Sequence, residues 1–245
     1  MRFAVKTDKG MVREINEDSY NIIAGYSDIP DTFIVADGMG GHNSGEVASK
    51  MAVDFVSGEV MKFSSALKEK EDILNYITSI MEKANSVVYA SSLQNEMNSG
   101  MGTTLIMAVI HNGMLYVGHI GDSRVYLLRK DEMRQITTDH SYIEELIKTG
   151  SLTREEAQYH PKKNVITRAL GCSEYIKVDT YLSDIQEGDT LIICTDGLTN
   201  MLNEDEIKRI VTSTDDIDAA CDELVRKTNE YGGIDNVTVI LIKNI

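Results

Sequence analysis

Two segments of the chain run apolar and then end in an Asp-Gly pair, so each can place a carboxylate at the end of a buried strand. FIVADG ends at Asp37-Gly38 and LIICTDG ends at Asp196-Gly197. Asp235 comes just before the apolar run VTVILI, and Asp122 lies in a sharp break between two apolar runs. Asp18, next to Glu17, is a fifth candidate. Carboxylates that converge at sheet ends repel one another and raise each other's pKa unless a cation lies between them.

A hard divalent cation is therefore the occupant that we expect. Asp, backbone carbonyl and water oxygens suit Mg²⁺ or Mn²⁺, whereas zinc normally recruits His or Cys at recognisable spacing. Any single Asp-Gly pair is more often an ordinary turn, and it is the set of acids that favours a metal site. A calcium loop of the EF-hand type is the competing explanation, but no stretch has its Asp-x-Asp-x-Asp-Gly spacing.

Two further residues near these acids could act on a phosphoryl group. His42 follows the glycine-rich run after Asp37 and could protonate a leaving group at neutral pH, although a histidine near a helix cap is the simpler interpretation without the acids. Arg13 has the planar, permanently charged fork that suits phosphoryl oxygens. A surface salt bridge to Glu14 or Glu17 is an equally good interpretation of Arg13 from local sequence.

Other phosphate chemistries lack their residues in this chain. No cysteine is followed by arginine six positions later, so a phosphocysteine mechanism has no candidate. The chain contains neither Gly-x₄-Gly-Lys-Ser/Thr nor a complete Gly-x-Gly-x-x-Gly. Direct attack by a metal-bound water is the mechanism that remains.

Composition limits the partners. The 245 residues carry a net charge of −15, which would repel nucleic acid and anionic lipid, and would also repel a phosphorylated substrate unless bound cations reversed the charge locally. The sequence has no signal-peptide pattern and no apolar run of membrane-spanning length, so we expect a cytoplasmic protein without membrane insertion. The three cysteines, Cys172, Cys194 and Cys221, are expected to be buried thiols.

The elements that must position the acids alternate between extended and helical patterns. Extended runs predict strands at residues 3–7, 19–25, 32–37, 103–110, 114–120, 124–129, 164–170, 176–182, 190–196 and 236–242. Helical spacing predicts helices from Asn43, across 73–87, near Asn203 and near Ile217, with a short helical excursion at about 141–161. Local hairpins with paired helices between them predict an α+β fold, a four-layer αββα sandwich of two central antiparallel sheets flanked by helix pairs. We expect a single domain over residues 1–245.

Several ordered motifs resemble those of the metal-dependent protein phosphatases of the 2C type, particularly the compact bacterial members. The resemblance covers nearly the whole chain, and the motifs that carry it lie at residues 12–18, 37–42, 102–104, 121–124, 167–171, 195–197 and 235–236. It implies the same sandwich of two sheets, with a metal centre in a cleft at one end. The segment 141–161 corresponds to a flap beside the cleft that varies among relatives.

The resemblance also implies roles for individual residues. Asp37 would bridge two Mn²⁺ or Mg²⁺ ions, Gly38 would offer its carbonyl to the second ion, and Asp196 and Asp235 would complete the first. Glu17 and Asp18 would act mainly through bound waters, and Asp122 would help Asp196 to hold a third, weaker ion. Arg13 matches the phosphate-binding arginine and His42 the general acid.

These expectations define a serine/threonine protein phosphatase in which a metal-bridging water attacks phosphorus directly. Its expected partners are phosphorylated proteins, with a bacterial serine/threonine kinase and its substrates as the first candidates, and we expect a monomer. Two alternatives stay open: a metal-dependent phosphoester hydrolase for small molecules, and a catalytically silent protein that binds phosphoproteins.

Overall fold

Strand β3 (Asp31–Met39) shows why the central strands have almost continuous apolar sequences. In the computed structural model, which describes residues 1–40, 44–63, 70–94, 96–157 and 160–244, β3 is covered on both faces. Phe33 and Val35 pack in the layer between two sheets, whereas Ile34 and Ala36 pack in the layer beneath helices. Apolar residues are therefore required at consecutive positions and not only at alternate ones.

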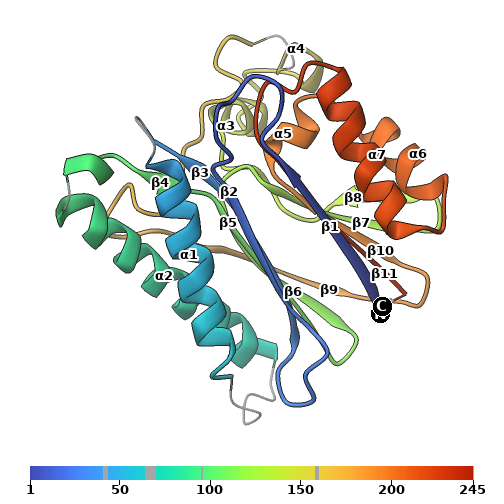
Figure 1. The fold of residues 1–245 in the computed structure, drawn as a ribbon, viewed down its shortest axis with the longest axis horizontal. Helices are drawn as coiled ribbons and strands as arrows, with labels where there is room; N and C mark the ends of the chain where they lie inside the picture. The colour runs from blue at the N-terminus through green and yellow to red at the C-terminus, as the bar shows by residue number, and fades with distance from the viewer. Residues whose placement is uncertain (41–43, 64–69, 95, 158–159, 245) are drawn as a thin grey trace.

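The strands form two antiparallel sheets that are stacked face to face (Figure 1). The first sheet has the order β1 (Arg2–Asp8), β11 (Val237–Lys243), β10 (Thr190–Cys194), β7 (Arg124–Arg129) and β8 (Glu132–Gln135). The second has the order β2 (Asp18–Ile23), β3, β5 (Leu105–His111), β6 (Met114–Ile120) and β9 (Asp179–Asp184), and β4 (Gly102–Thr103) pairs with β3.

Two pairs of helices cover the outer faces of the sheets, as Figure 1 shows. Helices α1 (Gly45–Val60) and α2 (Lys70–Gln94) pack on the second sheet, and α6 (Glu204–Thr212) and α7 (Ile217–Glu230) pack on the first. A capping box between Asn203 and Glu206 begins α6, and Asp216 caps α7, so both helices begin where their sequences predict. The four-layer αββα arrangement is confirmed. None of the described helices is long and apolar enough to cross a membrane.

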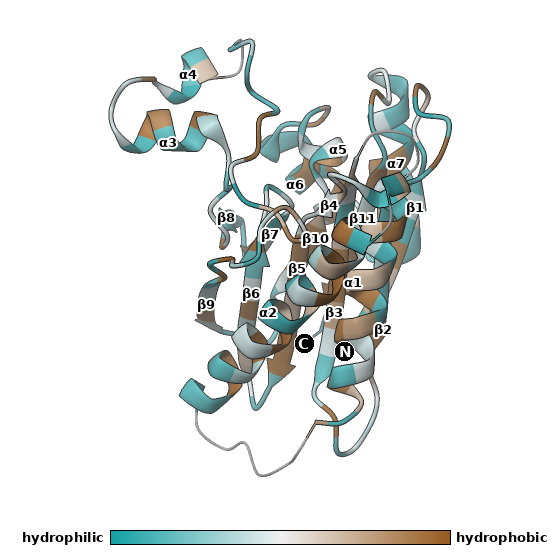
Figure 2. Ribbon diagram, turned by 90° about the vertical axis from the view of Figure 1, so that its left-hand side faces the viewer, coloured by the Kyte–Doolittle hydropathy of each residue, from teal (hydrophilic) through white to brown (hydrophobic). Residues whose placement is uncertain are grey.

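The expected excursion at 141–161 contains two short helices, α3 (Tyr142–Lys148) and α4 (Arg154–Ala157), in its described part. They stand out from one end of the sandwich (Figure 2). We call residues 141–157 the flap. A short helix, α5 (Asp196–Thr199), follows β10 at the same end, and a 3-10 turn, η1 (Glu96–Asn98), follows α2.

Three expectations about local structure are wrong. Residues 164–170 form no strand but only isolated bridges from Ile166 to Ser141 and from Leu170 to Thr103, because this segment crosses the end of the sandwich instead of joining a sheet. Strand β3 does not stop at Asp37 but continues to Met39, where it gains β4 as a partner. Cys172 is exposed, because it lies in a surface segment outside the sheets and helices, while Cys194 and Cys221 are buried.

Candidate active site

A cavity of about 280 Å³ opens at the end of the sandwich where the two sheets meet. Its lining combines residues that are far apart in the sequence, from the loop before β2, from β3, from the β6–β7 break, from α5 and from the loop before β11. The lining residues are Arg13, Glu17, Asp37, Gly38, Met39, Gly40, Thr104, Asp122, Asn164, Ile166, Asp196 and Asp235.

Asp37 is fixed by strands on both sides. Its Cα lies opposite that of Asp18 in the β2–β3 register. On the other side, the Asp37 backbone N–H donates to Thr104 Oγ1 (2.9 Å), and the Thr104 N–H donates to the Asp37 carbonyl (2.9 Å). The backbone of Asp37 is therefore held in place by the sheet before any ligand binds.

The glycines after Asp37 and Asp196 are required by close backbone packing. A Cβ on Gly38 would lie 2.1 Å from the carbonyl oxygen of Gly45, and one on Gly197 would lie 1.9 Å from that of Asn236. Neither glycine has a positive φ, so a turn conformation is not the reason for either. Each Asp-Gly pair thus lets a second segment of the site lie directly against the chain that carries the carboxylate.

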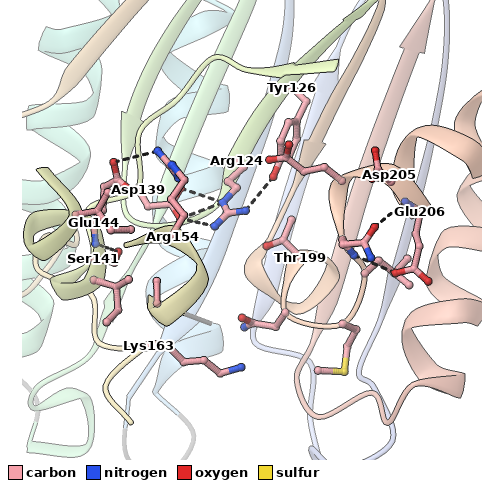
Figure 3. Close-up of a pocket in the computed structure, with 18 residues that line it drawn as sticks. Arg124, Tyr126, Asp139, Ser141, Glu144, Arg154, Lys163, Thr199, Asp205 and Glu206 are labelled. Carbon is pink, nitrogen blue, oxygen red and sulfur yellow. Dashed lines mark hydrogen bonds and ion pairs between the residues drawn. The ribbon is translucent and has the colours of Figure 1, made fainter. Parts of the chain in front are cut away.

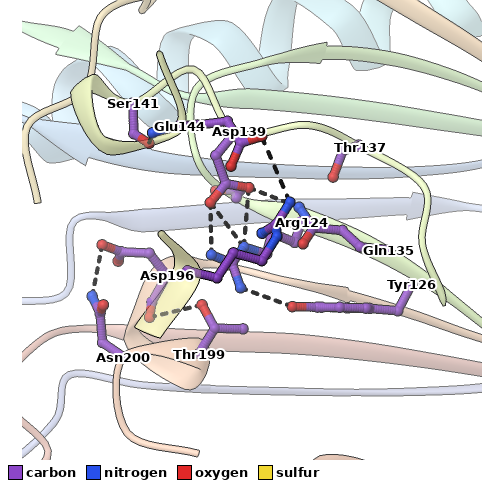
Figure 4. Close-up of polar contacts among 12 residues, drawn as sticks. Arg124, Tyr126, Gln135, Thr137, Asp139, Ser141, Glu144, Asp196, Thr199 and Asn200 are labelled. Carbon is purple, nitrogen blue, oxygen red and sulfur yellow. Dashed lines mark hydrogen bonds and ion pairs between the residues drawn. The ribbon is translucent and has the colours of Figure 1, made fainter. Parts of the chain in front are cut away.

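Asp196 and Asp235 each have a partner that orients the carboxylate. Asn200 Nδ2 donates to Asp196 Oδ2 (2.9 Å), one turn along from the start of α5 (Figure 4). Arg13 Nη2 donates to Asp235 Oδ2 (2.8 Å), and the arginine side chain is 49% exposed. Arg13 therefore pairs with an acid 222 positions away in the chain. The local salt bridge to Glu14 or Glu17, which the sequence also allowed, is not the ion pair that the structure shows.

Asn236 joins the two loops that carry Arg13 and Asp235. Its Oδ1 accepts from the Glu17 N–H (2.8 Å), and its Nδ2 donates to the carbonyls of Lys9 (2.9 Å) and Ile15 (2.8 Å). The Asp235-Asn236 pair is one of the motifs in the sequence, but the local sequence predicts no role for the asparagine. Its amide binds the N-terminal loop to the start of β11 and so sets the position of Glu17.

The electrostatics of the cavity favour a cation. Burial raises the pKa of Asp37, Asp122 and Asp196, and repulsion adds to this, chiefly from Asp18 at Asp37, from Asp196 at Asp122 and from Asp235 at Asp196. Burial likewise raises the pKa of Asp18 to about 7, against the effect of hydrogen bonds that lower it. Arg13 is the one basic side chain among the described residues of the lining, which also include five acids. The cavity therefore carries more negative than positive charge, and a bound cation would reduce the repulsion among its acids.

The residues fit a hydrated divalent cation. Asp18 Oδ1 is enclosed by protein and has no hydrogen-bond partner among the described residues, so the site contains an acceptor that lacks a ligand. In the described part of the chain, no group of three His, Cys, Asp or Glu side chains is arranged to bind one metal ion directly. Mg²⁺ and Mn²⁺ tolerate this arrangement, because such ions retain several waters and need only one or two carboxylates each. A structural zinc site would need four direct ligands.

Seven of the nine predicted site residues line this one cavity: Arg13, Glu17, Asp37, Gly38, Asp122, Asp196 and Asp235. Asp18 lies behind the lining, opposite Asp37 in the sheet. The ninth, His42, lies outside the described residues.

A larger cavity, of about 710 Å³, was not expected from the sequence. It lies between the flap on one side and α5 with the start of α6 on the other (Figure 3). It adjoins the smaller cavity, because Asn200 and Lys163 line the larger one while their neighbours Asp196 and Asn164 line the smaller one. The lining combines residues of β7, the flap, α5 and the start of α6, and no local sequence pattern indicates that these separate segments enclose a cavity.

Comparison with known proteins agrees with this fold. Residues 12–231 match the family described as protein phosphatase 2C. A serine/threonine phosphatase of Listeria innocua is 42% identical over 243 residues, which cover 99% of this chain and 96% of that protein. The solved serine/threonine phosphatase of S. agalactiae superposes with a TM-score of 0.92 at 34% identity and covers 100% of this chain and 99% of that one. The catalytic domain of the phosphatase PstP, solved in complex with two manganese ions, superposes with a TM-score of 0.84 at 32% identity and covers 98% and 96% of the two chains.

A sandwich of this topology with an acid-lined cavity at its end, together with a family match over most of its length, defines the class. The chain belongs to the protein phosphatase 2C family, and it is an enzyme.

Proposed function

We propose that this protein is a metal-dependent serine/threonine phosphatase that hydrolyses phosphoserine and phosphothreonine in other proteins. The observation that carries the proposal is the convergence of five carboxylates and one half-exposed guanidinium in a single cavity. Bound Mg²⁺ or Mn²⁺ would supply a water of lowered pKa as the nucleophile and would offset the charge of the phosphoryl group. The relatives named as serine/threonine phosphatases, and the neighbour with two manganese ions, support this assignment.

The residues divide into three groups by their surroundings. Asp37, Asp196 and Asp235, with the carbonyl of Gly38, would hold the two central ions, because all four line the cavity. Glu17 and Asp18 would act mainly through water ligands, and Asp122 with Asp196 would hold a third ion. Asp122 fits that role because it lines the same cavity as Asp196, and its pKa is raised by burial and then by the charge of Asp196.

Arg13 would bind the phosphoryl oxygens. Its fork is partly exposed and, within the described part of the chain, only Nη2 bonds to a carboxylate, that of Asp235, so the other donors of the guanidinium can turn toward a substrate. His42 would protonate the departing seryl or threonyl oxygen.

Phosphorylated proteins are the proposed substrates, and a serine/threonine kinase and its targets are the first partners to test. The larger cavity beside the flap could hold the part of a substrate protein that flanks its phosphorylated residue. A cytoplasmic location remains a prediction that the three free thiols support. We also propose that the whole chain acts as one catalytic domain and as a monomer.

The direct test is a comparison of substrates with purified protein. We expect hydrolysis of p-nitrophenyl phosphate with Mn²⁺ that is lost with EDTA, and faster hydrolysis of phosphoseryl and phosphothreonyl peptides than of nucleotides or sugar phosphates. A preference for the small phosphates would assign the protein to another class of phosphoester hydrolase. Binding of phosphopeptides without turnover in the presence of Mn²⁺ would identify a silent phosphoprotein-binding relative.

A further inference from the structure

The two oxygens of the Asp18 carboxylate have very different surroundings. Oδ2 accepts hydrogen bonds from Thr238 Oγ1 (2.7 Å) and from Thr195 Oγ1 (3.0 Å). Oδ1 is enclosed and has no partner in the part of the chain that the structure describes. An enclosed carboxylate oxygen without a partner is destabilising unless a ligand fills the gap.

The direction of every hydrogen bond in this group follows from counting protons. The single hydroxyl proton of Thr238 is donated to Asp18, so the bond between Thr238 and Thr7 (2.8 Å) must use the proton of Thr7. Thr7 in turn accepts from Asn16 Nδ2 (2.8 Å). Thr195 donates to Asp18 and accepts from the Thr238 backbone N–H (2.9 Å). The hydroxyls of Thr195 and Thr238 therefore both donate to Oδ2, and the other donors orient these two hydroxyls.

These contacts cross from one sheet to the other at the active-site end. Asp18 is the first residue of β2 in the second sheet, whereas Thr7 and Thr238 belong to β1 and β11 of the first sheet, and Thr195 directly follows β10. Thr195 and Thr238 are fully buried. Threonine is β-branched, so its χ1 rotation is restricted and the hydroxyls form a stiff support.

We propose that Thr195 and Thr238, with Thr7 behind them, are positioning residues for Asp18: they occupy Oδ2 and so keep Oδ1 free for a hydrated divalent cation. The proposal rests on the metal site of the proposed function and adds three residues that do not line the cavity. Support of this kind sets the orientation of a ligand, and its loss typically weakens metal binding by 10- to 100-fold.

Thr238→Val and Thr195→Val remove one hydroxyl each and keep the shape of the side chain. We expect each variant to bind Mn²⁺ about 10- to 100-fold more weakly in titration calorimetry of the metal-free protein. Thr238→Ser and Thr195→Ser keep the hydroxyl and should bind within a few-fold of wild type. Thr32→Val is the matched control, because Thr32 is also buried in a sheet but its hydroxyl donates to the carbonyl of Pro30.

A second measurement separates positioning from a general loss of structure. In an Asp18→Asn background, Thr238→Val should cause no further loss of Mn²⁺ affinity, because the hydroxyl acts only through the carboxylate. Wild-type affinity in a folded Thr238→Val or Thr195→Val variant, or an equal loss in the Asp18→Asn background, would overturn the proposal. Failure of the wild-type protein itself to bind Mn²⁺ would instead refute the proposed metal site. The two valine variants are independent, so a folded form of either gives the answer.

Discussion

The acids of the cavity are held in a state that suits a cation and disfavours the metal-free protein. Burial and mutual repulsion raise the pKa values of four aspartates, with only Arg13 as a positive neighbour in the lining. At the scale of single residues, activity and stability of the metal-free form should therefore respond in opposite directions when one charge is removed.

Asp37→Asn tests this opposition. We expect phosphatase activity to fall at least about 10²-fold, because a central ligand is lost. In EDTA, the thermal midpoint should rise by roughly 2–4 °C for each kcal/mol of relieved repulsion. Turnover assays with Mn²⁺ and thermal unfolding with EDTA measure the two effects. Near-normal activity of Asp37→Asn would contradict the assigned role of Asp37.

Arg13→Lys separates the geometry of the guanidinium from its charge. Lysine keeps the positive charge but loses the planar fork, so kcat/KM for phosphopeptides should fall roughly 10- to 100-fold. Arg134→Lys, at an exposed position on β8, is the matched control and should leave the rate unchanged. Equal kinetics of the Arg13 and Arg134 variants would show that Arg13 only pairs with Asp235.

At the scale of elements, one ion pair joins β7 to the segment that leads into the flap. Arg124 donates from Nε and Nη2 to the Asp139 carboxylate, and its Nη1 donates to Tyr126 Oη (2.9 Å), as Figure 4 shows. The side chains are largely buried, at 27% and 12% exposure. The pair raises the pKa of Arg124 in spite of burial. Its loss would leave the buried guanidinium of Arg124 without the carboxylate that accepts its hydrogen bonds.

Asp139→Ala should therefore destabilise the protein by about 3 kcal/mol or more, as measured by denaturant unfolding. The double change Arg124→Met with Asp139→Leu should lose less, because no buried charge is left without a partner. Arg226→Ala breaks an exposed pair with Glu223 on α7 and should change stability by less than about 1 kcal/mol. A loss for Asp139→Ala as small as that for Arg226→Ala would contradict the structural role of the buried pair.

Two neutral histidines anchor the same segment. His140 Nδ1 accepts from the Gly121 N–H (3.1 Å) and its Nε2 contacts Asp179 (3.0 Å), while His119 Nε2 contacts the carbonyl of Ser123 (2.9 Å). Burial lowers the pKa of both histidines, that of His119 to about 3. The centroids of the two rings lie 4.8 Å apart, so protonation of one histidine would disfavour protonation of the other.

The contribution of His119 to stability should fall as the pH falls below about 6.5, because the unfolded chain takes up a proton that the buried ring of His119 does not accept down to about pH 3. The buried aspartates, whose pKa values are raised, contribute in the opposite direction, so the contribution of His119 is measured as a difference between variants. One withheld proton lowers the free energy of unfolding by about 2 kcal/mol between pH 6.5 and 5. His119→Gln keeps a donor for the carbonyl of Ser123 and should remove this contribution, so its pH dependence in denaturant unfolding at several pH values should differ from that of the wild-type protein by this amount. An unchanged slope would exclude His119 as its source.

At the scale of the whole molecule, the site exists only when both sheets are stacked. Arg13 and Asp235 are 222 positions apart, and Asp18 meets Thr195 and Thr238 across the two sheets. Metal binding should therefore be coupled to folding, because the unfolded chain cannot bring these groups together.

Mn²⁺ should stabilise the folded protein by about 2.7 kcal/mol at 100 times its Kd, which corresponds to a rise in thermal midpoint of roughly 5–10 °C. Thermal unfolding with Mn²⁺ and with EDTA measures the difference, and Asp37→Asn should show a much smaller rise. Equal midpoints for the wild-type protein with and without saturating Mn²⁺ would contradict this coupling.

The sequence by itself determined the fold class and the members of the site. Apolar runs of strand length, such as FIVAD and LIIC, can be recognised locally because both faces of each sheet are buried. The αββα sandwich followed from these runs and the helical spacing between them. Asp37, Asp196 and Asp235 each adjoin such a run. They indicated a shared site because the ends of strands in stacked sheets lie close together.

Only the tertiary structure decided how these residues are held. Arg13 pairs with Asp235, Asn236 joins two loops, and two threonines, Thr195 and Thr238, donate to one oxygen of Asp18. Each of these contacts links segments far apart in the chain. Residues 164–170 look like a strand but cross the end of the sandwich, where Ile166 and Leu170 form only isolated bridges to Ser141 and Thr103. The local pattern of apolar residues indicates how deeply a segment is buried. The partners of a polar side chain depend on which distant segments pack beside it, and the stacking of the two sheets sets that.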